Sequence, residues 1–147
     1  MHPGSTVVDL RVYRDPAFTP LVVMIDPQRE YVTENRALGL ESAAAVIENC
    51  STILRFAREE GFPIAFVRWQ QRGKFFDGFG DYGAWIDGLG PTGSDMVFDR
   101  NLPSCYANED FAGMMERGGG SNAVIAGFTG SLACLSTVVD AFHRGHS

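Results

Sequence analysis

The part of this chain that most restricts its fold is a strand, a turn and a helix that follow one another between residues 122 and 142. Residues 123–126 form a short apolar run, typical of a strand buried on both faces. Gly127 and Gly130 bracket a tight turn, and apolar residues then recur at helical spacing. This apolar stripe comprises Leu132, Leu135, Val138, Val139 and Phe142. A strand, a glycine turn and a helix in this order direct backbone N–H groups and the positive end of the helix dipole at one point, where an anion or an oxyanion could bind. An ordinary strand–helix connection has the same sequence pattern.

The rest of the chain continues this alternation of strands and helices. A buried strand at residues 20–26 ends on Asp26, the position at which open α/β sheets place their chemistry. The clearest helix, at residues 41–60, carries one apolar stripe that includes Cys50, which we interpret as a core residue, and Gly61 marks the end of this helix. The remaining predicted elements are strands at 63–68 and 95–100 and a helix at 108–117, which is capped by Asn108. This order predicts an α/β fold with a parallel, doubly wound sheet and helices on both faces.

Two segments lie outside this pattern. Residues 1–19 form an N-terminal arm, in which the alternation at 6–14 fits either a half-exposed strand or an extended arm. Residues 69–92 are rich in glycine and aromatic residues and show no clear periodicity. A loop of that length is either the lid or wall of a functional site or an Ω-loop that covers the sheet edge. We treat residues 1–147 as a single domain.

The composition narrows the possible partners. Twelve Lys and Arg stand against 18 Asp and Glu, and the net charge of −6 argues against nucleic acid and anionic membranes as partners. The chain has no apolar run of transmembrane length and no signal-peptide pattern at its start. Its three cysteines form no disulfide pattern, so we expect a cytoplasmic location. Without CxxC or HExxH motifs, and with histidines only near the chain ends, we expect no metal site and no cofactor.

Three separated motifs resemble those of the isochorismatase-like hydrolases, the cysteine hydrolase superfamily. Residues 21–28, Leu-Val-Val-Met-Ile-Asp-Pro-Gln, resemble the family's strand ending in Asp-x-Gln, whose aspartate is the catalytic acid/base. Residues 97–106, Val-Phe-Asp-Arg-Asn-Leu-Pro-Ser-Cys-Tyr, are similar to its Lys-x-x-x-Ser-Ala-Phe element. Residues 127–142 resemble its Gly-x-x-x-x-x-Cys-x-x-Ser-Thr-x-x-Asp-Ala turn and helix. The resemblance implies a parallel three-layer fold and a non-proline cis peptide bond at Phe128–Thr129.

The chain departs from the family pattern at two catalytic positions. Arg100 occupies the place of the lysine, and arginine keeps the positive charge but cannot shuttle a proton. Ala133 occupies the place of the nucleophilic cysteine. Cys134 is the next residue, and because one residue turns a helix by about 100°, we expect its thiol to point elsewhere. Cys105, which replaces the family's alanine, is a weaker alternative nucleophile.

A branch of the family that lacks the cysteine, the true isochorismatases, resembles the chain more closely. These enzymes hydrolyse a vinyl ether and release pyruvate, which requires a proton donor and positive groups but no thiolate. The resemblance implies that Asp26 is the acid, its pKa raised by burial, that Arg100 binds a carboxylate and that Ala133 leaves room for substrate. One of two glutamines, Gln70 or Gln71, would orient water. The other residues that it places around the substrate are Gln28, Tyr31, Trp69, Phe128, Thr129 and Gly130.

Three functions follow from this comparison and stay open. The chain is a cysteine-independent hydrolase of a small anionic vinyl ether, a catalytically inactive relative that binds or assembles, or an amidase that uses Cys134 or Cys105. Its ligand would be a small carboxylate or amide. The resemblance also implies two strands after the last helix, which a chain ending at Ser147 does not contain. The strand at 123–126 would then expose an edge, so we expect either that the sequence is a truncated form or that another chain covers this edge. The resemblance also implies a homo-oligomer, at least a dimer.

Overall fold

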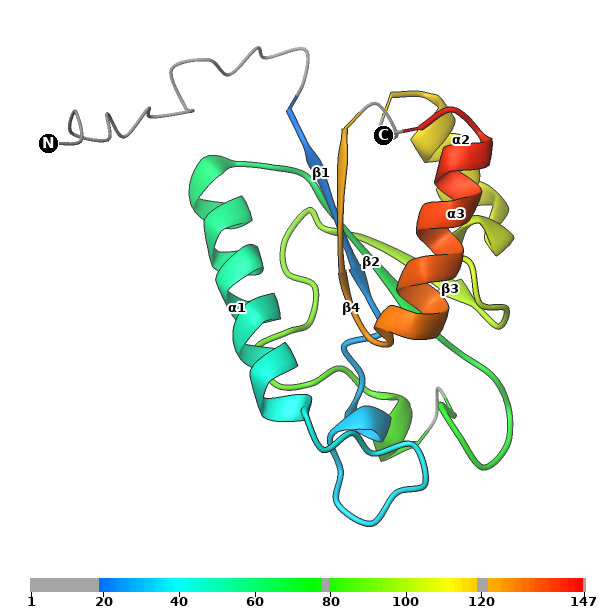
Figure 1. Cartoon of the computed structure of the whole chain (residues 1–147). Helices are drawn as coiled ribbons and strands as arrows, with labels where there is room; N and C mark the ends of the chain where they lie inside the picture. The colour runs from blue at the N-terminus through cyan, green and yellow to red at the C-terminus, as the bar shows by residue number, and fades with distance from the viewer. Residues whose placement is uncertain (1–18, 78–79, 119–121, 147) are drawn as a thin grey trace, which may run out of the picture.

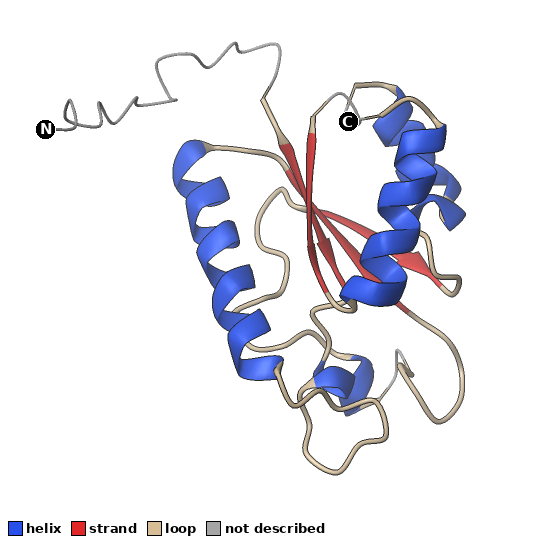
Figure 2. Cartoon of the chain, viewed as in Figure 1, coloured by secondary structure: helices blue, strands red, loops and turns tan. Residues whose placement is uncertain are grey.

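The computed structural model describes residues 19–77, 80–118 and 122–146, and the predicted arm strand at 6–14 lies outside these residues. Four parallel strands form one sheet in the order β3-β2-β1-β4, which confirms the predicted α/β class. Figures 1 and 2 show this sheet with one long helix on one side and two shorter helices on the other. The strands and α-helices in chain order are β1 (Leu21–Ile25), α1 (Ala43–Glu60), β2 (Ile64–Trp69), β3 (Met96–Arg100), α2 (Glu109–Glu116), β4 (Ala123–Gly127) and α3 (Leu135–His143).

Each face of the sheet carries its own hydrophobic core. One core joins α1 to the face of the sheet that includes Met24 and Phe66. Trp85, from the segment at residues 69–92 that we call the long loop, packs edge-on against Phe66. The other core joins α2, together with Ala133 and Cys134 just before α3, to the face of the sheet that includes Val23 and Val67. Strand β1 is buried along its whole length because both of its faces are covered. This explains why its sequence reads as a continuous apolar run without alternation.

The helix ends follow the signals in the sequence. The backbone of Gly61 is left-handed (φ 69°), and its N–H donates to the carbonyl oxygens of Ala57 and Arg58, which ends α1. The side chain of Asn108 accepts a hydrogen bond from the N–H of Phe111 at 2.9 Å and so caps α2. No helix among the described residues is both long and apolar enough to span a bilayer.

The expectation that residues 123–126 form a strand buried on both faces is wrong, and the large apolar residues of the helical segment that follows are exposed. β4 pairs only with β1 among the described strands, so it lies at the edge of the sheet and is half-exposed. In the last helical segment, residues 130–143, small residues such as Ala133 and Thr137 face the core, and the large apolar residues face solvent. Helical spacing identified the helix correctly, but it does not tell which of two apolar faces meets the sheet.

The turn between β4 and α3 is tighter than an ordinary strand–helix connection. Gly127 has φ 126°, and a Cβ atom there would collide with the carbonyl group of Ile25. The peptide bond between Phe128 and Thr129 is cis, as the resemblance implied. A π-helical turn, Gly130–Cys134, then leads into α3. This turn sets which side chain at its end faces the carboxyl edge of the sheet.

Candidate active site

A buried ion pair lies at the carboxyl edge of the sheet. Asp26 directly follows β1, has a left-handed backbone (φ 50°), and donates its N–H to the carbonyl oxygen of Val67. Arg100 is the last residue of β3, on the far side of β2. Its Nη1 lies 2.5 Å from Asp26 Oδ1 and its Nη2 lies 3.0 Å from Oδ2, and both side chains are fully buried. The parallel sheet therefore brings together two residues separated by 74 positions in the chain.

The two groups of this pair shift one another's protonation. Burial raises the pKa of Asp26, while the hydrogen bonds and charge of Arg100 act against that rise. Burial lowers the pKa of Arg100, but the hydrogen bonds and charge of Asp26 outweigh this and raise it. Arg100 also donates through Nε to the carbonyl oxygen of Pro103 at 3.3 Å. Its charge is therefore already neutralised inside the protein, so a substrate carboxylate would have to compete with Asp26 for it.

A cavity of about 250 Å³ opens above the pair. The lining residues with polar side chains are Asp26, Gln71 and Thr129, besides Tyr31 and Trp69 with their hydroxyl and indole N–H groups. Ala133 reaches it from the π-helical turn and presents only a methyl group. The full lining is Asp26, Tyr31, Leu38, Trp69, Gln71, Phe75, Phe76, Thr129, Leu132 and Ala133. A small ligand with a flat apolar body and one polar end would match this lining.

Aromatic rings form most of the cavity wall. Tyr31 stacks on Phe128 with ring centroids 5.4 Å apart and planes 6° apart, and it lies 5.1 Å from the ring of Phe76. The ring of Trp69 lies 5.1 Å from the guanidinium carbon of Arg100, so it covers the ion pair as a cation–π partner. The long loop thus supplies part of the wall, while its Trp85 packs on the sheet. Trp85 therefore contacts a face of the sheet and not its edge, and a functional role for this loop stays a prediction.

A second buried carboxylate attaches the long loop to the segment after β1. Glu30 is fully buried and accepts two hydrogen bonds from Arg36, at 2.9 and 3.0 Å. Its Oε2 also accepts a long hydrogen bond from the N–H of Phe76, at 3.5 Å. Arg36 donates to the carbonyl oxygen of Lys74 and stacks 4.0 Å from the ring of Tyr82. These contacts fix the aromatic wall, and no motif in the sequence marked Glu30 or Arg36 for that role.

None of the three cysteines is among the residues that line the cavity. Cys134 packs against the core on the α2 side and is not among the cavity-lining residues. Burial, followed by the nearby charge of Asp26, raises the pKa of its thiol to about 11. Burial raises the pKa of Cys105 to about 12, and it also raises the pKa of Cys50, which lies on the buried face of α1. Thiols with such pKa values are almost wholly protonated at neutral pH and are weak nucleophiles.

The other predicted site residues fall into two groups. Tyr31, Trp69, Gln71 and Thr129 line the cavity, and their contact with a substrate stays a prediction. Those that do not line it are Gln28, Gln70, Phe128 and Gly130. Of the two glutamines, Gln71 therefore reaches the cavity, and its Oε1 accepts a hydrogen bond from Trp69 Nε1 at 3.0 Å. The buried Oε1 of Gln70 accepts no hydrogen bond from the described residues.

Gln28 has a structural place in the fold. Its Nε2 donates to the carbonyl oxygens of Trp69 and Gly83, and its Oε1 accepts from the N–H of Trp69. It thus joins the end of β2 to the long loop. Leu38 and Leu132 were missed as lining residues: Leu38 lies in a loop without periodicity, and Leu132 was identified only as part of a helical apolar stripe.

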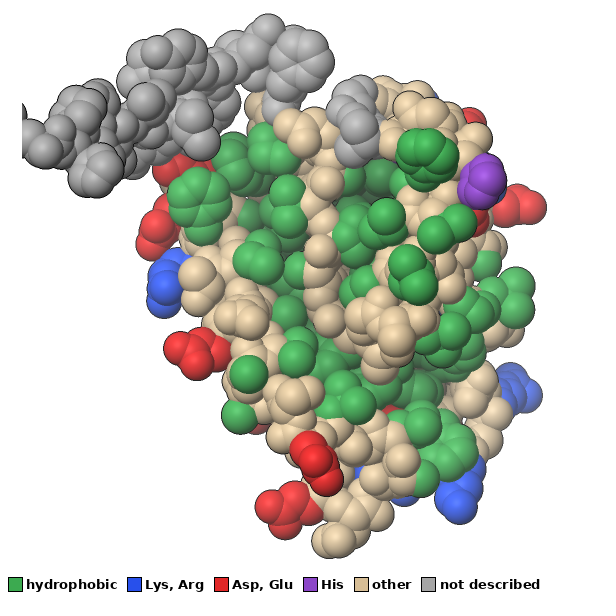
Figure 3. Space-filling model, in the orientation of Figure 1, with side chains coloured by type: hydrophobic (Ala, Val, Ile, Leu, Met, Phe, Trp, Pro, Cys, Tyr) green, Lys and Arg blue, Asp and Glu red, His purple; other side chains and the backbone are tan. Residues whose placement is uncertain are grey.

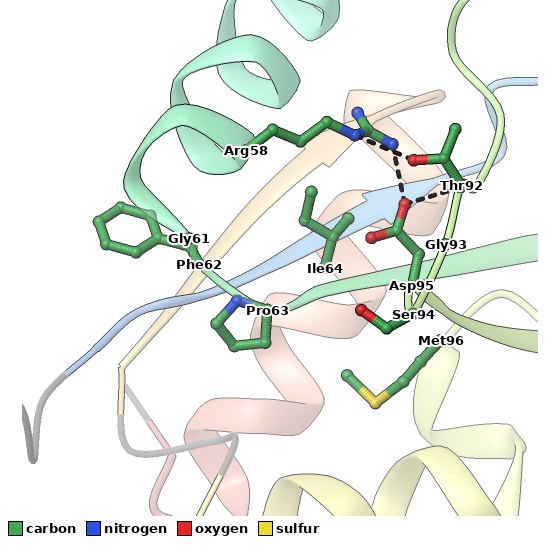
Figure 4. Close-up of a pocket in the computed structure, with 10 residues that line it drawn as sticks. All are labelled: Arg58, Gly61, Phe62, Pro63, Ile64, Thr92, Gly93, Ser94, Asp95 and Met96. Atoms are coloured by element: carbon green, nitrogen blue, oxygen red, sulfur yellow. Dashed lines mark hydrogen bonds and ion pairs between the residues drawn. The ribbon is translucent and has the colours of Figure 1, made fainter.

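A larger cavity lies at the opposite end of the sheet. It measures about 500 Å³ and lies between the end of α1 and the loop before β3 (Figure 4). Its charged groups satisfy one another, because Arg58 donates to Asp95 and to the hydroxyl of Thr92. The strands begin there, whereas ligands of open parallel sheets bind where the strands end. No set of three or more potential metal ligands clusters among the described residues, in this cavity or elsewhere.

Comparisons with known proteins identify the family model and the fold that this chain matches. The family model described as the isochorismatase domain matches residues 20–147. An isochorismatase from Pseudomonas putida KT2440 is 25% identical, with a TM-score of 0.81, over 93% of this chain and 73% of that one. No curated protein matches the chain.

Two amidases share the fold at lower identity. N-carbamoylsarcosine amidase from Thermoplasma acidophilum is 19% identical, with a TM-score of 0.77, over 87% of this chain and 78% of that one. Nicotinamidase/pyrazinamidase from Bacillus subtilis is 17% identical, with a TM-score of 0.77, over 88% of this chain and 81% of that one. At these identities the likeness establishes the fold alone.

Proposed function

The chain belongs to the isochorismatase domain family, and from that premise we propose that it is a hydrolase that cleaves a small vinyl ether without a cysteine nucleophile. Asp26 is the general acid in this proposal. The observation that carries it is that the methyl group of Ala133, and no thiol, lines the cavity above Asp26. The raised thiol pKa values support the same conclusion, because they leave no thiolate for amide chemistry at neutral pH.

The proposed reaction needs one proton donor and one water molecule. Protonated Asp26 gives its proton to the terminal enol carbon, and the ether carbon becomes an oxocarbenium ion. Water attacks that carbon, returns a proton to Asp26, and forms a hemiketal that collapses to an alcohol and a ketone. With a carboxylate on the enol the ketone is pyruvate. Burial favours the protonated acid before the transfer, and Arg100 stabilises the carboxylate after it.

Pyruvate release from isochorismate and chorismate-type ethers tests this proposal. We expect turnover by the unmodified protein, its loss in Asp26→Asn, and no loss after alkylation of all thiols. A Cys134→Ser variant should also stay active, because Cys134 does not line the cavity. Loss of activity on alkylation would instead support an amidase that uses Cys134 or Cys105. Absence of pyruvate from every ether in the panel would rule out the vinyl-ether reaction.

A second candidate is a relative that binds its ligand without turnover. The observation in its favour is that both carboxylate oxygens of Asp26 are held by Arg100 and shielded from solvent. An aspartate held in this way donates a proton only if the guanidinium yields. Calorimetric binding of a small aromatic carboxylate or amide, without conversion over hours, would support this candidate. Turnover of any amide or ether in the panel would exclude it.

A further inference from the structure

We propose that Trp69 acts as a positioning residue in the candidate active site, because it fixes which end of the Gln71 amide faces the ligand. Its indole N–H holds the amide oxygen, so the amide nitrogen, Nε2, presents a hydrogen-bond donor to the cavity. The polar end of the ligand is then an acceptor, the oxygen of a carboxylate or of an uncharged carbonyl group. This inference rests on the proposed function in one respect, because both take the cavity above Asp26 as the ligand site.

The first argument is the orientation of the Gln71 amide. Trp69 Nε1 donates a hydrogen bond to it at 3.0 Å, and because an indole N–H can only donate, the amide atom that it meets is the oxygen. Gln71 Nε2 forms no hydrogen bond with a described residue. Of the polar side-chain atoms in the described residues, only Gln70 Oε1 is both fully buried and without a partner. Gln71 Nε2 is therefore accessible, and a ligand in the cavity that Gln71 lines can reach it.

The second argument is that the indole is held in place. The Gln28 amide binds the backbone of Trp69, because its Oε1 accepts from the N–H and its Nε2 donates to the carbonyl oxygen, both at 2.8 Å. The Trp69 ring lies 6.2 Å from the ring of Phe76 and 5.1 Å from the guanidinium carbon of Arg100. The backbone of Gln71 is bound as well, since its N–H donates to the carbonyl oxygen of Phe76 at 3.3 Å. Turning the amide over would break the indole hydrogen bond and place two donors against each other.

The third argument is that the cavity offers no free cation. None of the described residues that line it is Lys, Arg or His. Arg100 is bound by both carboxylate oxygens of Asp26. Leu132, the most exposed lining residue at 52%, precedes α3, and Figure 3 shows hydrophobic side chains gathered over α3 with charged side chains mostly toward the rim of that face. An acceptor that enters the cavity is therefore met by uncharged donors.

The Gln71 amide is the uncharged donor whose role is fixed. Tyr31 and Thr129 also line the cavity, but a hydroxyl group donates or accepts as it rotates. The indole N–H of Trp69 is already used by Gln71. The nitrogen of Gln71 can only donate, and a ligand that offers another donor at the same place leaves it without a partner, which lowers the affinity. The amide therefore sets the specificity of the cavity, and Trp69 keeps it in that role.

Calorimetric titration of three probes with the same benzene ring tests this inference. Benzoate and acetophenone present acceptor oxygens and no N–H or O–H donor at neutral pH, whereas benzylamine presents an ammonium donor. We expect the unmodified protein to bind the tighter of the two acceptors at least about ten times more tightly than benzylamine. The net charge of −6 favours the cation, so it opposes this preference and does not create it.

Three variants test whether the preference depends on the indole N–H. Trp69→Phe keeps an aromatic ring but lets the amide turn over, so the preference should fall at least about fivefold. Gln71→Leu removes the donor and should abolish the preference. Trp85→Phe is the matched control, because it makes the same change at a tryptophan that does not line the cavity, and it should leave the preference unchanged. Far-ultraviolet circular dichroism checks that each variant keeps the fold.

A packing role for Trp69 would weaken the binding of all three probes alike and leave their ratio unchanged, and that result would overturn the proposal. A preference that Gln71→Leu leaves intact would overturn it equally, as would an unmodified protein that binds neither acceptor more tightly than benzylamine. Tighter binding of benzoate identifies the acceptor as a carboxylate and tighter binding of acetophenone as an uncharged carbonyl group, and either result supports the inference. Because none of the probes is a vinyl ether, these results are independent of pyruvate release, which tests the proposed chemistry.

Discussion

Replacing Arg100 by methionine is expected to destabilise the protein by about 3–5 kcal/mol at neutral pH, the usual cost of leaving one partner of a buried ion pair without the other. Both side chains of the Asp26–Arg100 pair are fully buried, and two hydrogen bonds join them. Methionine fills much of the space left by the arginine stem, so the loss is mainly that of charge compensation. For a domain of this size the melting temperature should fall by about 6–20 °C.

The destabilisation caused by Arg100→Met should depend on pH, because protonation of Asp26 removes the unpaired buried charge. Burial already raises the pKa of Asp26, and Arg100 is the main cause acting against that rise. Removing Arg100 therefore raises the pKa of Asp26 further in the folded state. A carboxyl group whose folded pKa is raised stabilises the fold at low pH, and this stability is lost as pH rises through the folded pKa. The penalty of Arg100→Met should thus be smaller near pH 5 than at pH 8.

The assay is urea unfolding of the single and double variants between pH 5 and pH 8. In the double variant Asp26→Asn/Arg100→Met no buried charge remains at this position, so it should be more stable than Arg100→Met alone at pH 8. The denaturant slope should stay unchanged, so that the midpoint reports stability. A penalty that does not vary with pH, or a double variant that is no more stable than the single one, would refute the view of this pair as a compensated buried charge.

Three further predictions concern the parts that shape the site. Gly127→Ala should cost more than about 1 kcal/mol in thermal unfolding, because its Cβ meets the Ile25 carbonyl at positive φ, whereas Gly130→Ala has open space and should cost little. Glu30→Gln should free the aromatic loop and speed its proteolysis between residues 72 and 83, and equal cleavage rates would contradict the role of Glu30. Cys134 should react slowly with iodoacetamide at pH 7 and faster toward pH 11, and a thiol that titrates near neutrality would disprove its burial.

The Asp26–Arg100 pair limits the ligands that the cavity can accept. In a site with a free cation a carboxylate would provide most of the binding energy. Here the guanidinium is satisfied by Asp26 and by the carbonyl oxygen of Pro103, and aromatic rings line most of the remaining space. Shape and apolar contact therefore contribute more to ligand selection than charge does.

The sequence by itself determined the order and type of the elements. Continuous apolar runs predicted β1 and β2, Gly61 and Asn108 marked helix ends, and the alternation of elements fixed a parallel sheet. It also placed Asp26 and Arg100 at strand ends, because parallel strands end at one edge of a sheet. The resemblance of residues 127–142 to the family motif implied that Ala133, and not Cys134, faces the cavity, and Ala133 is the one of the two that lines it. All of these are local patterns, which a short stretch of chain expresses without its neighbours.

Only the tertiary structure decided how these parts meet. Arg100 and Asp26 are 74 residues apart in the chain. No local sequence pattern predicts that the guanidinium binds this carboxylate and is therefore not free to bind a ligand. The sequence also did not predict which face of the last helix is buried, because this helix has one face of small residues and another of large apolar residues. Which face is buried depends on the space left above β1 and β4, and that space exists only once the sheet is assembled.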